Sequence, residues 1–311
     1  MRNSIAKRAF FVIPPSVHLL DITGPAHIFH EAEAYGADLS LHFIALQQNG
    51  KVLSSAGLFL SDLQDFSAFS LTENDLLFLP GMDFDTLTDT RFLSDCAPFF
   101  QWLNEQMENG AQICSVCTGA FLLGFAGLLR KRKTTTHWKY FDRFQECFPD
   151  ALLQKERLFV SDGNLHASGG VSSGIDLALH LMEAHYGAPF AAKIAKEVVL
   201  YLRRGENDPQ LSVFLRYRNH LSDQVHQVQD LMATRLDEKL TIPDLAEAVH
   251  TSPRNLTRIF RKHTGLSIGE YHKQLRTERA RQLLAEGHKL EATAKAVGLK
   301  SVNQLRHLLP P

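Results

Sequence analysis

The 311-residue sequence contains only four cysteines, Cys96, Cys114, Cys117 and Cys147. Their spacing indicates no disulfide framework. Cys114 and Cys117 form the one C-x-x-C pair, but no second Cys or His pair follows at zinc-finger spacing. We therefore expect no structural metal and no cofactor, and we expect a reducing cytoplasm as the compartment.

The sequence also lacks a convincing targeting or membrane segment. Its first 15 residues hold about five apolar residues before two prolines, fewer than the ~7–15 of a signal-peptide core. Residues 113–133, ICSVCTGAFLLGFAGLLRKRK, begin with 17 mostly apolar residues, which as a helix would span about 26 Å of a ~30 Å hydrocarbon core. Three glycines interrupt this stretch and no second span follows. We expect a soluble strand, turn and helix here.

The formal net charge of -1 hides an asymmetry along the chain. Residues 1–200 carry 15 Lys and Arg against 22 Asp and Glu, whereas residues 201–311 carry 18 against 12. Opposite charges in the two halves indicate different partners, with nucleic acid at the basic end. The composition changes near residues 201–230, so we predict a first domain over 1–200, a linker over 201–230 and a second domain over 231–311.

Short apolar runs alternate with helix-like stretches in the first domain. This alternation predicts parallel strands whose faces are covered by helices, an α/β fold of the flavodoxin-like sandwich type. A hairpin is expected at 157–168, turning at Asp162 and Gly163, before a helix over 174–187. The predicted strands are 9–14, 41–46, 75–81 and 111–116, and the predicted helices are 24–35, 91–109 and 118–129.

Cys117 follows the predicted strand 111–116 directly, and Gly119 follows two residues later. Ligands of parallel α/β sheets bind beyond the carboxyl ends of the strands. A sharp strand–turn–helix connection at this edge resembles a nucleophile elbow. The adjacent helix N-terminus is expected to lower the pKa of the thiol.

Other polar residues of this domain leave alternatives open. Asp21 is either a site residue or the cap of the helix expected from residue 24. His27 and His30 lie one helical turn apart, but no carboxylate pattern supports a metal site. The glycine-rich turn 169–174 serves either tight packing or anion binding.

The motifs VCTGAFLLGFAGLL, TTTHW, DGNLHASGGVSSGIDLALHL and LLDITGP resemble the ThiJ/PfpI branch of the glutamine-amidotransferase-like superfamily over most of residues 9–187. The resemblance implies that Asp21 meets the elbow Cys117, as in isocyanide hydratases, and that the Gly81 backbone N–H completes an anion pocket. Thr118 stands where proteases of the superfamily have histidine, and the H-x-E of amidotransferases is missing. His137 is a further pocket candidate. Without a base to orient the thiol, the resemblance implies a ligand pocket without turnover.

The basic end predicts a helix, a tight turn and a second helix over 239–265. Thr241 with Asp244 forms a capping box, and Ser252 followed by Pro253 starts the second helix. Three arginines of that helix share the face opposite its apolar side. Guanidinium and amide groups on such a face suit the major groove of DNA. The predicted DNA-binding residues here are Ser252, Arg254, Asn255, Thr257, Arg258, Arg261 and Lys262.

A long capped helix over 267–287 leads to a second helix-turn-helix over 291–309, and this arrangement resembles the AraC/XylS regulator domain. Relative to that family, the chain stops early, at Pro310 and Pro311, so the second unit is expected to be incomplete and its last helix frayed. Its weaker set of predicted DNA-binding residues is Lys300, Ser301, Asn303, Gln304 and Arg306.

A ThiJ/PfpI-like domain before an AraC-type domain resembles GlxA-type transcription regulators. The resemblance implies a cytoplasmic, nucleoid-associated homodimer that binds double-stranded operator DNA and a small-molecule effector. Two alternatives stay open. One is an isocyanide-hydratase-like enzyme with a vestigial DNA-binding tail, and the other is a redox sensor acting through Cys117.

Overall fold

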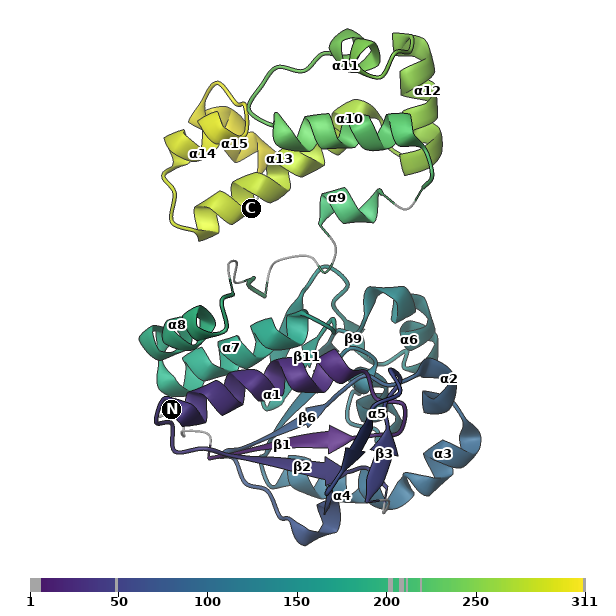
Figure 1. Cartoon of the computed structure of the whole chain (residues 1–311), viewed down its shortest axis with the longest axis vertical. Coiled ribbons are helices and arrows are strands. Elements are labelled where there is room, and N and C mark those ends of the chain that lie inside the picture. Colours follow the sequence, from purple (N-terminus) through teal and green to yellow (C-terminus); the bar gives the residue numbers. More distant parts are fainter. Residues whose placement is uncertain are drawn as a thin grey trace. The chain divides into compact units, whose positions relative to one another are not determined.

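A computed structural model describes residues 7–47, 50–200, 204–206, 210, 212–218 and 220–309. The chain separates into two compact units, residues 1–210 and residues 211–311 (Figure 1). From residue 201 we expected a linker followed by an entry helix, and helical residues occur in this part of the chain.

The first unit is built on a seven-stranded sheet in the order β10-β11-β7-β6-β1-β2-β5. All neighbouring strands are parallel except β10 and β11, which form the predicted antiparallel hairpin. The strands are β1 (Arg8–Ile13), β2 (Ser40–Ala45), β5 (Gln64–Asp65), β6 (Asp75–Leu79), β7 (Gln112–Val116), β10 (Phe159–Asp162) and β11 (Leu165–Ser168). Two small ladders pair β3 (Lys51–Leu53) with β4 (Phe59–Ser61) and β8 (Lys133–Thr134) with β9 (Leu152–Leu153).

Helices cover both faces of this sheet because its strands are apolar on both sides. Phe11 and Ile13 of β1 share one core with α1 (Leu19–Ala34), α7 (Ser173–Tyr186) and α8 (Ala188–Glu197). Phe10 and Val12 share the other with helices of the opposite layer. That layer contains α2 (Phe84–Leu87), α3 (Thr90–Asp95), α4 (Ala97–Glu108), α5 (Gly119–Phe125) and α6 (Phe141–Cys147). The short 3₁₀ helices are η1 (Phe66–Ala68) and η2 (Trp138–Tyr140). The predicted α/β sandwich is confirmed.

Several predicted boundaries are wrong for identifiable reasons. The first helix begins at Leu19, because α1 accommodates Pro25 within its length. The helix expected over 91–109 is divided at Cys96, and Pro98 lies in the first turn of α4, where proline is tolerated. The helix expected over 118–129 ends at Phe125, and Gly127 follows with a φ of 80°.

The stretch 113–133 contains a buried strand, an elbow and a largely buried helix, as the strand–turn–helix interpretation predicts. Among the described residues, no helix combines the length and apolar character needed to cross a membrane.

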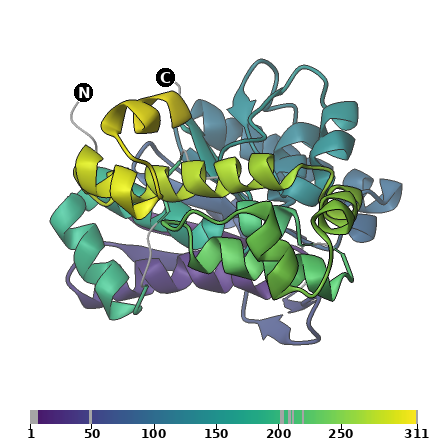
Figure 2. The same cartoon turned by 90° about the horizontal axis from the view of Figure 1, so that it is seen from above.

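The second unit is helical, with two cores connected by one long helix (Figure 2). The first core joins α10, α11, α12 and the start of α13, and the second joins the end of α13 to α14 and α15. This arrangement confirms two helix-turn-helix units on a shared linking helix. The helices are α9 (Val213–Arg216), α10 (Asp223–Thr234), α11 (Ile242–Ala248), α12 (Pro253–Thr264), α13 (Ile268–Ala285), α14 (Leu290–Ala296) and α15 (Val302–Leu308).

Candidate functional sites

Cys117 lies at a tight elbow between β7 and α5, with a left-handed φ of 59° and 3% of its surface exposed. The turn depends on two glycines that touch it. A Cβ on Gly119 would lie 2.0 Å from the Leu79 carbonyl oxygen, and one on Gly170 would lie 2.3 Å from the Cys117 Cβ. The elbow predicted from the sequence is therefore present, and its backbone is strained and closely packed.

Asp21 is buried beside the elbow, in the first turn of α1. Its Oδ2 accepts the backbone N–H of Gly81 at 3.2 Å, and its Oδ1 accepts the backbone N–H of Val171 at 2.7 Å. The helix cap is His18, so the alternative that Asp21 caps α1 is wrong. Asp21 holds together the loops that follow β1, β6 and β11.

Gly81 occupies the position that the resemblance implies, but its backbone N–H donates to Asp21. A Cβ on Gly81 would lie 2.5 Å from the Asp21 Oδ2, 2.8 Å from the Cys117 Cβ and 3.0 Å from the Thr118 Oγ1. Only glycine fits here. The structure thus brings Asp21, Gly81, Cys117 and Thr118 into one cluster, with the Gly81 N–H bound by a carboxylate instead of facing a ligand.

The Thr118 hydroxyl is fully buried and both accepts the backbone N–H of Met82 and donates to the Met82 carbonyl, each at 3.0 Å. It fastens the loop after β6 to the elbow. His137 caps η2, where its Nδ1 accepts the Lys139 backbone N–H at 3.4 Å. Burial lowers the pKa of His137, and the Asp21 charge opposes that shift.

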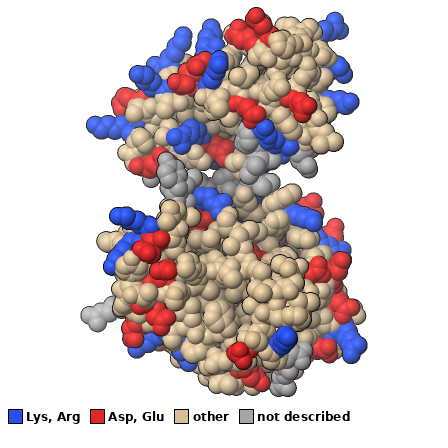
Figure 3. Space-filling model, in the orientation of Figure 1, with Lys and Arg blue, Asp and Glu red and all other residues tan. Residues whose placement is uncertain are grey.

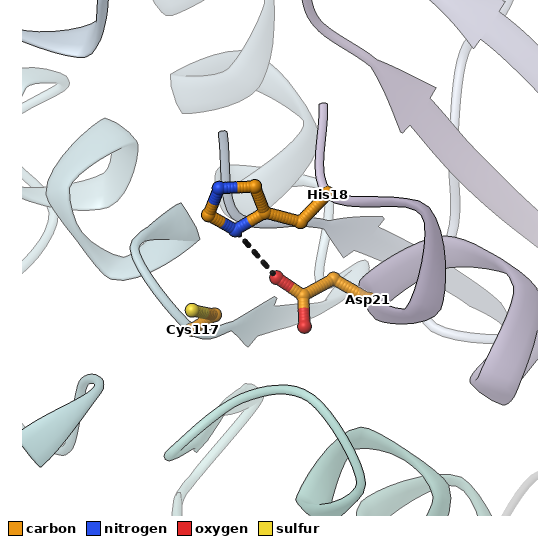
Figure 4. A group of neighbouring side chains, drawn as sticks. All are labelled: His18, Asp21 and Cys117. Atoms are coloured by element: carbon orange, nitrogen blue, oxygen red, sulfur yellow. Dashed lines mark ion pairs between the residues drawn. The ribbon is translucent and has the colours of Figure 1, made fainter. Parts of the chain in front are cut away.

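His18 is a site residue that the sequence analysis missed. Its Nδ1 lies 3.5 Å from the Asp21 Oδ2, and ligand-type atoms of His18, Asp21 and Cys117 all lie within 4.8 Å of one another (Figure 4). His18 is the N-cap of α1 and lies three residues before Asp21. This spacing is the signal in the sequence that could have indicated its role. Its side chain is 37% exposed, so it connects the buried carboxylate to solvent.

Cys117 is a protonated thiol in this environment. Burial raises its pKa well above the ordinary value, and the neighbouring Asp21 charge raises it further. The expectation that the helix N-terminus favours the thiolate is wrong, because loss of hydration and a nearby negative charge outweigh the terminus of a short helix. A neutral buried thiol is a weak nucleophile.

A hollow of about 970 Å³ lies elsewhere in the first unit. It runs along α1, β2 and β4, and the residues that line it are mainly apolar, including Leu20, Phe43 and Leu60. The predicted pocket residues are not among them. The elbow cluster is closely packed by comparison.

The second unit presents its candidate site on α12. Leu256 and Phe260 are fully buried, while five residues line a shallow hollow of about 490 Å³ on the outside of the helix. The Ser252 hydroxyl accepts the Asn255 backbone N–H at 3.2 Å, and Gly265 ends the helix with a φ of 75°. The arginine face predicted from the sequence is therefore exposed on a well-capped helix. The lining residues are Arg254, Thr257, Arg258, Arg261 and Lys262.

Asn255 is half-buried, and its side-chain amide is engaged within the unit. The amide nitrogen donates to the Thr251 Oγ1 at 2.8 Å, and its oxygen accepts from Arg258 at 2.9 Å. Asn255 therefore orients the Arg258 guanidinium.

On the face shown in Figure 3, Lys and Arg side chains project from the rim of the second unit.

The second helix-turn-helix carries its predicted residues on α15. Leu305 is fully buried, and Lys300, Ser301, Asn303, Gln304 and Arg306 are exposed. Ser301 accepts the Gln304 backbone N–H at 3.3 Å, and the Gln304 side chain accepts the Lys300 backbone N–H at 2.8 Å. The helix expected to fray is regular from Val302 to Leu308, while Pro310 and Pro311 lie outside the described residues.

Comparisons with known proteins agree with both units. The model of the DJ-1/PfpI family matches residues 7–184, and a helix-turn-helix domain model matches residues 245–309. The HTH-type transcriptional regulator CdhR of Pseudomonas aeruginosa is 30% identical over 278 residues, which cover 89% of this chain and 80% of that protein. The isonitrile hydratase of Pseudomonas putida is 32% identical over 181 residues, 58% of this chain and 73% of the enzyme.

Among solved structures, Drosophila melanogaster DJ-1beta superposes with a TM-score of 0.53 at 16% identity, over 64% of this chain and all of that one. At this identity the match concerns the fold alone. The similarity to a regulator extends along both units, whereas the similarity to the hydratase covers 58% of the chain.

Proposed function

We propose a function from the premise that this chain belongs to the DJ-1/PfpI family and joins that domain to an AraC-type helix-turn-helix domain. This combination is that of transcriptional regulators, as in CdhR. The proposal is a homodimeric regulator that acts in the cytoplasm on nucleoid DNA. The second unit recognises an operator, and the first unit binds an effector near Cys117 and Asp21.

The observation that carries the proposal is the exposed face of α12. Its arginines stand on a helix that is held by Leu256 and Phe260 in the core and by caps at both ends. A rigid helix of this kind places guanidinium groups against base edges and phosphates at little cost in conformational entropy. The Arg258 guanidinium, oriented by Asn255, is the strongest candidate for a base contact.

The effector is proposed to be an amine or another nitrogenous metabolite. Asp21 offers a carboxylate that a cation could approach past the partly exposed His18. The raised pKa of the Cys117 thiol makes it a weak nucleophile, which supports binding without turnover. Effector binding would change the dimer geometry or the placement of the helix-turn-helix units.

The homodimer is supported by the apolar hollow along α1. Leu20 is 44% exposed and Phe43 is 38% exposed at its rim, and a second copy would remove this apolar surface from water. Sedimentation equilibrium of the chain, repeated with Leu20→Glu, measures this directly. A monomeric chain would contradict the dimer and leave the DNA-binding proposal in place.

The decisive experiment compares binding to the DNA upstream of the protein's own gene with binding to random DNA, at two salt concentrations. We expect a preference of about 10³ for the upstream DNA. Arg258→Ala should reduce specific affinity by about 10-fold. Arg143→Ala is the matched control, because Arg143 is an exposed arginine of the first unit that pairs with Glu146 at 3.2 Å. Equal, steeply salt-dependent binding to both DNAs would overturn the operator proposal.

The second candidate function is hydration of an isocyanide to a formamide, favoured by the match to isonitrile hydratase and by the Asp21–Cys117 arrangement. Formamide production that disappears in Cys117→Ala would establish it. For the redox alternative, peroxide treatment should change the affinity for DNA. The raised pKa of Cys117 argues against easy oxidation, because susceptibility follows thiolate character.

A further inference from the structure

Gln210 is the last residue of the first unit, and its side-chain amide is fixed between two loops. The amide nitrogen donates to the Thr136 carbonyl at 2.9 Å and to the Thr135 Oγ1 at 3.0 Å. The amide oxygen accepts the backbone N–H of Trp138 at 3.0 Å. Both the N–H group and the oxygen of the Gln210 amide are thus hydrogen-bonded to the loop that follows β8.

The same amide packs against the turn that precedes α7. A Cβ on Gly169 would lie only 2.3 Å from the Gln210 Cδ. The amide of Gln210 can therefore pack against this position only because Gly169 has no side chain. The next residue, Gly170, packs directly against the Cys117 Cβ. Gln210 therefore contacts Gly169, the residue next to the glycine that packs against the elbow.

The loop held by Gln210 also holds the elbow. The Thr136 hydroxyl donates to the Cys117 carbonyl at 2.9 Å, and the Cys117 N–H donates to the Ser168 carbonyl at 3.1 Å. The two hydrogen bonds of the Cys117 backbone thus lead to Thr136 and Ser168. The Thr136 carbonyl accepts a hydrogen bond from the Gln210 amide. Ser168 directly precedes Gly169, against which the same amide packs.

The chain enters the second unit immediately beyond Gln210. The Val213 backbone N–H donates to the Glu278 Oε2 of α13 at 2.9 Å, so the chain is attached to the second unit three residues later. Upstream of Gln210, Arg204 makes three hydrogen bonds to the Asp176 carboxylate, from its backbone N–H at 3.0 Å and from its guanidinium at 2.6 and 3.0 Å. Of the hydrogen bonds described within the first unit, those of Gln210 lie nearest along the chain to the second unit.

We infer that Gln210 is the positioning residue that transmits the state of the Cys117 turn to the DNA-binding unit. This inference rests on the proposed function. An effector that displaces the elbow or the turn at Gly170 moves Thr136 or Gly169, and the amide then loses its partners. Release of Gln210 frees the chain segment that leads to Val213, the start of α9 in the second unit.

The test is a double-mutant cycle in the full chain, read as the Kd for the upstream DNA. Asp21→Asn perturbs the elbow cluster, and Gln210→Leu removes both polar groups of the amide at nearly the same size. Gln154→Leu is the matched control, because the Gln154 side chain donates only to the nearby Leu152 carbonyl, at 3.0 Å. In the parent chain and in the Gln154→Leu control, we expect Asp21→Asn to change the Kd for the upstream DNA by about 5-fold or more. In the chain that already carries Gln210→Leu, we expect the same substitution to change that Kd by less than about 2-fold.

A second readout does not require DNA. Gln210→Leu should raise the rate at which iodoacetamide alkylates Cys117, followed by mass spectrometry of the modified peptide, by about 10-fold, because the turn loses its support. Gln154→Leu should leave that rate unchanged. An unchanged rate in Gln210→Leu would show that the amide does not support the elbow and would overturn the inference.

The failures of the two proposals are distinguishable. Loss of the preference for upstream over random DNA in the parent chain would refute the operator proposal and with it the inference. If that preference holds and Asp21→Asn shifts Kd equally with and without Gln210→Leu, the coupling does not pass through Gln210. A chain in which Asp21→Asn shifts no Kd at all contradicts the inference as well.

Discussion

The candidate sites of the two units are built in opposite ways. In the first unit, the Asp21 carboxylate accepts an N–H from Val171, 150 residues later in the chain. In the second unit, the three arginines of the candidate site on α12 lie between residues 254 and 261, on one helix. A site assembled from distant loops depends on the complete fold, whereas a site on one face of one helix depends on local spacing.

Burial separates the two sites further. Asp21 is 1% exposed and Cys117 is 3% exposed, whereas the arginines of α12 face solvent. Changes at the first site therefore alter packing before they alter ligand binding. Changes at the second site are expected to alter the proposed DNA affinity with little effect on stability. This contrast predicts different outcomes for matched substitutions in the two units.

The largest difference is expected for glycine-to-alanine substitutions. Gly119→Ala places a Cβ 2.0 Å from the Leu79 carbonyl oxygen, so it should reduce the free energy of unfolding of the first unit by at least about 3 kcal/mol. Gly269→Ala in α13 meets no atom within 4 Å and should stabilise the second unit by about 0.5 kcal/mol.

Urea unfolding separates these effects, because both tryptophans, Trp102 and Trp138, belong to the first unit. Tryptophan fluorescence follows the first unit, and the far-ultraviolet circular dichroism of the whole chain includes the helical second unit. Equal changes of the same sign for the two alanines would contradict the contrast between a closely packed elbow and an open helix surface.

An intermediate effect is expected from pH. Burial lowers the pKa of His166 in β11 to about 4, with smaller contributions from His180 and His185. Because the folded pKa lies below the unfolded value, the unfolded chain binds more protons between about pH 6.5 and pH 4. The first unit should therefore keep its full stability above pH 6.5 and lose roughly 2 kcal/mol by pH 5.

The measurement is the tryptophan-detected unfolding free energy at pH 7 and pH 5, for the parent chain and for His166→Gln, which should flatten the dependence. The second unit offers a matched control in His272, whose pKa is also lowered to about 4 by burial. His272→Gln should leave the tryptophan-detected dependence unchanged. The assignment to His166 is wrong if both variants flatten the curve equally.

The smallest effect is expected from a helix cap. The Ser267 hydroxyl accepts the Glu270 backbone N–H at 3.2 Å, and the Glu270 carboxylate accepts the Ser267 N–H at 2.8 Å. Ser267→Ala should destabilise the second unit by about 1 kcal/mol, measured by circular dichroism. Thr277→Ala in the same helix should cost nothing, because the Thr277 hydroxyl only bonds back to the Lys273 carbonyl. If Thr277→Ala reduced the stability of the second unit as much as Ser267→Ala, the prediction that the Ser267 cap stabilises α13 would be contradicted.

Local patterns in the sequence were sufficient for most of the second unit. The capping box of Thr241 and Asp244, the start of α12 at Ser252 and Pro253, and its buried Leu256 all follow from spacing over a few residues. These features involve contacts within one or two helical turns. Their prediction requires no knowledge of how distant segments meet.

The elbow was predictable for a related reason, since Cys117 and Gly119 directly follow an apolar strand. His18 was not recognised because the first helix was expected to begin at residue 24. Only the start of α1 at Leu19 shows that the three-residue spacing places the His18 ring 3.5 Å from the Asp21 carboxylate. Gln210 lies in a polar segment that resembles a linker, and its role becomes visible only where it meets Thr136 and Gly169.

The sequence by itself determined the alternation of strands and helices, the strained turn at Cys117 and the arginine face of α12, because these depend on short-range spacing and backbone preference. Tertiary structure decided the protonation of Cys117, the use of the Gly81 N–H by Asp21 and the position of Gln210. The physical reason is that burial and hydrogen bonding between distant loops arise only when the carboxyl ends of β1, β6, β7 and β11 come together at one edge of the sheet.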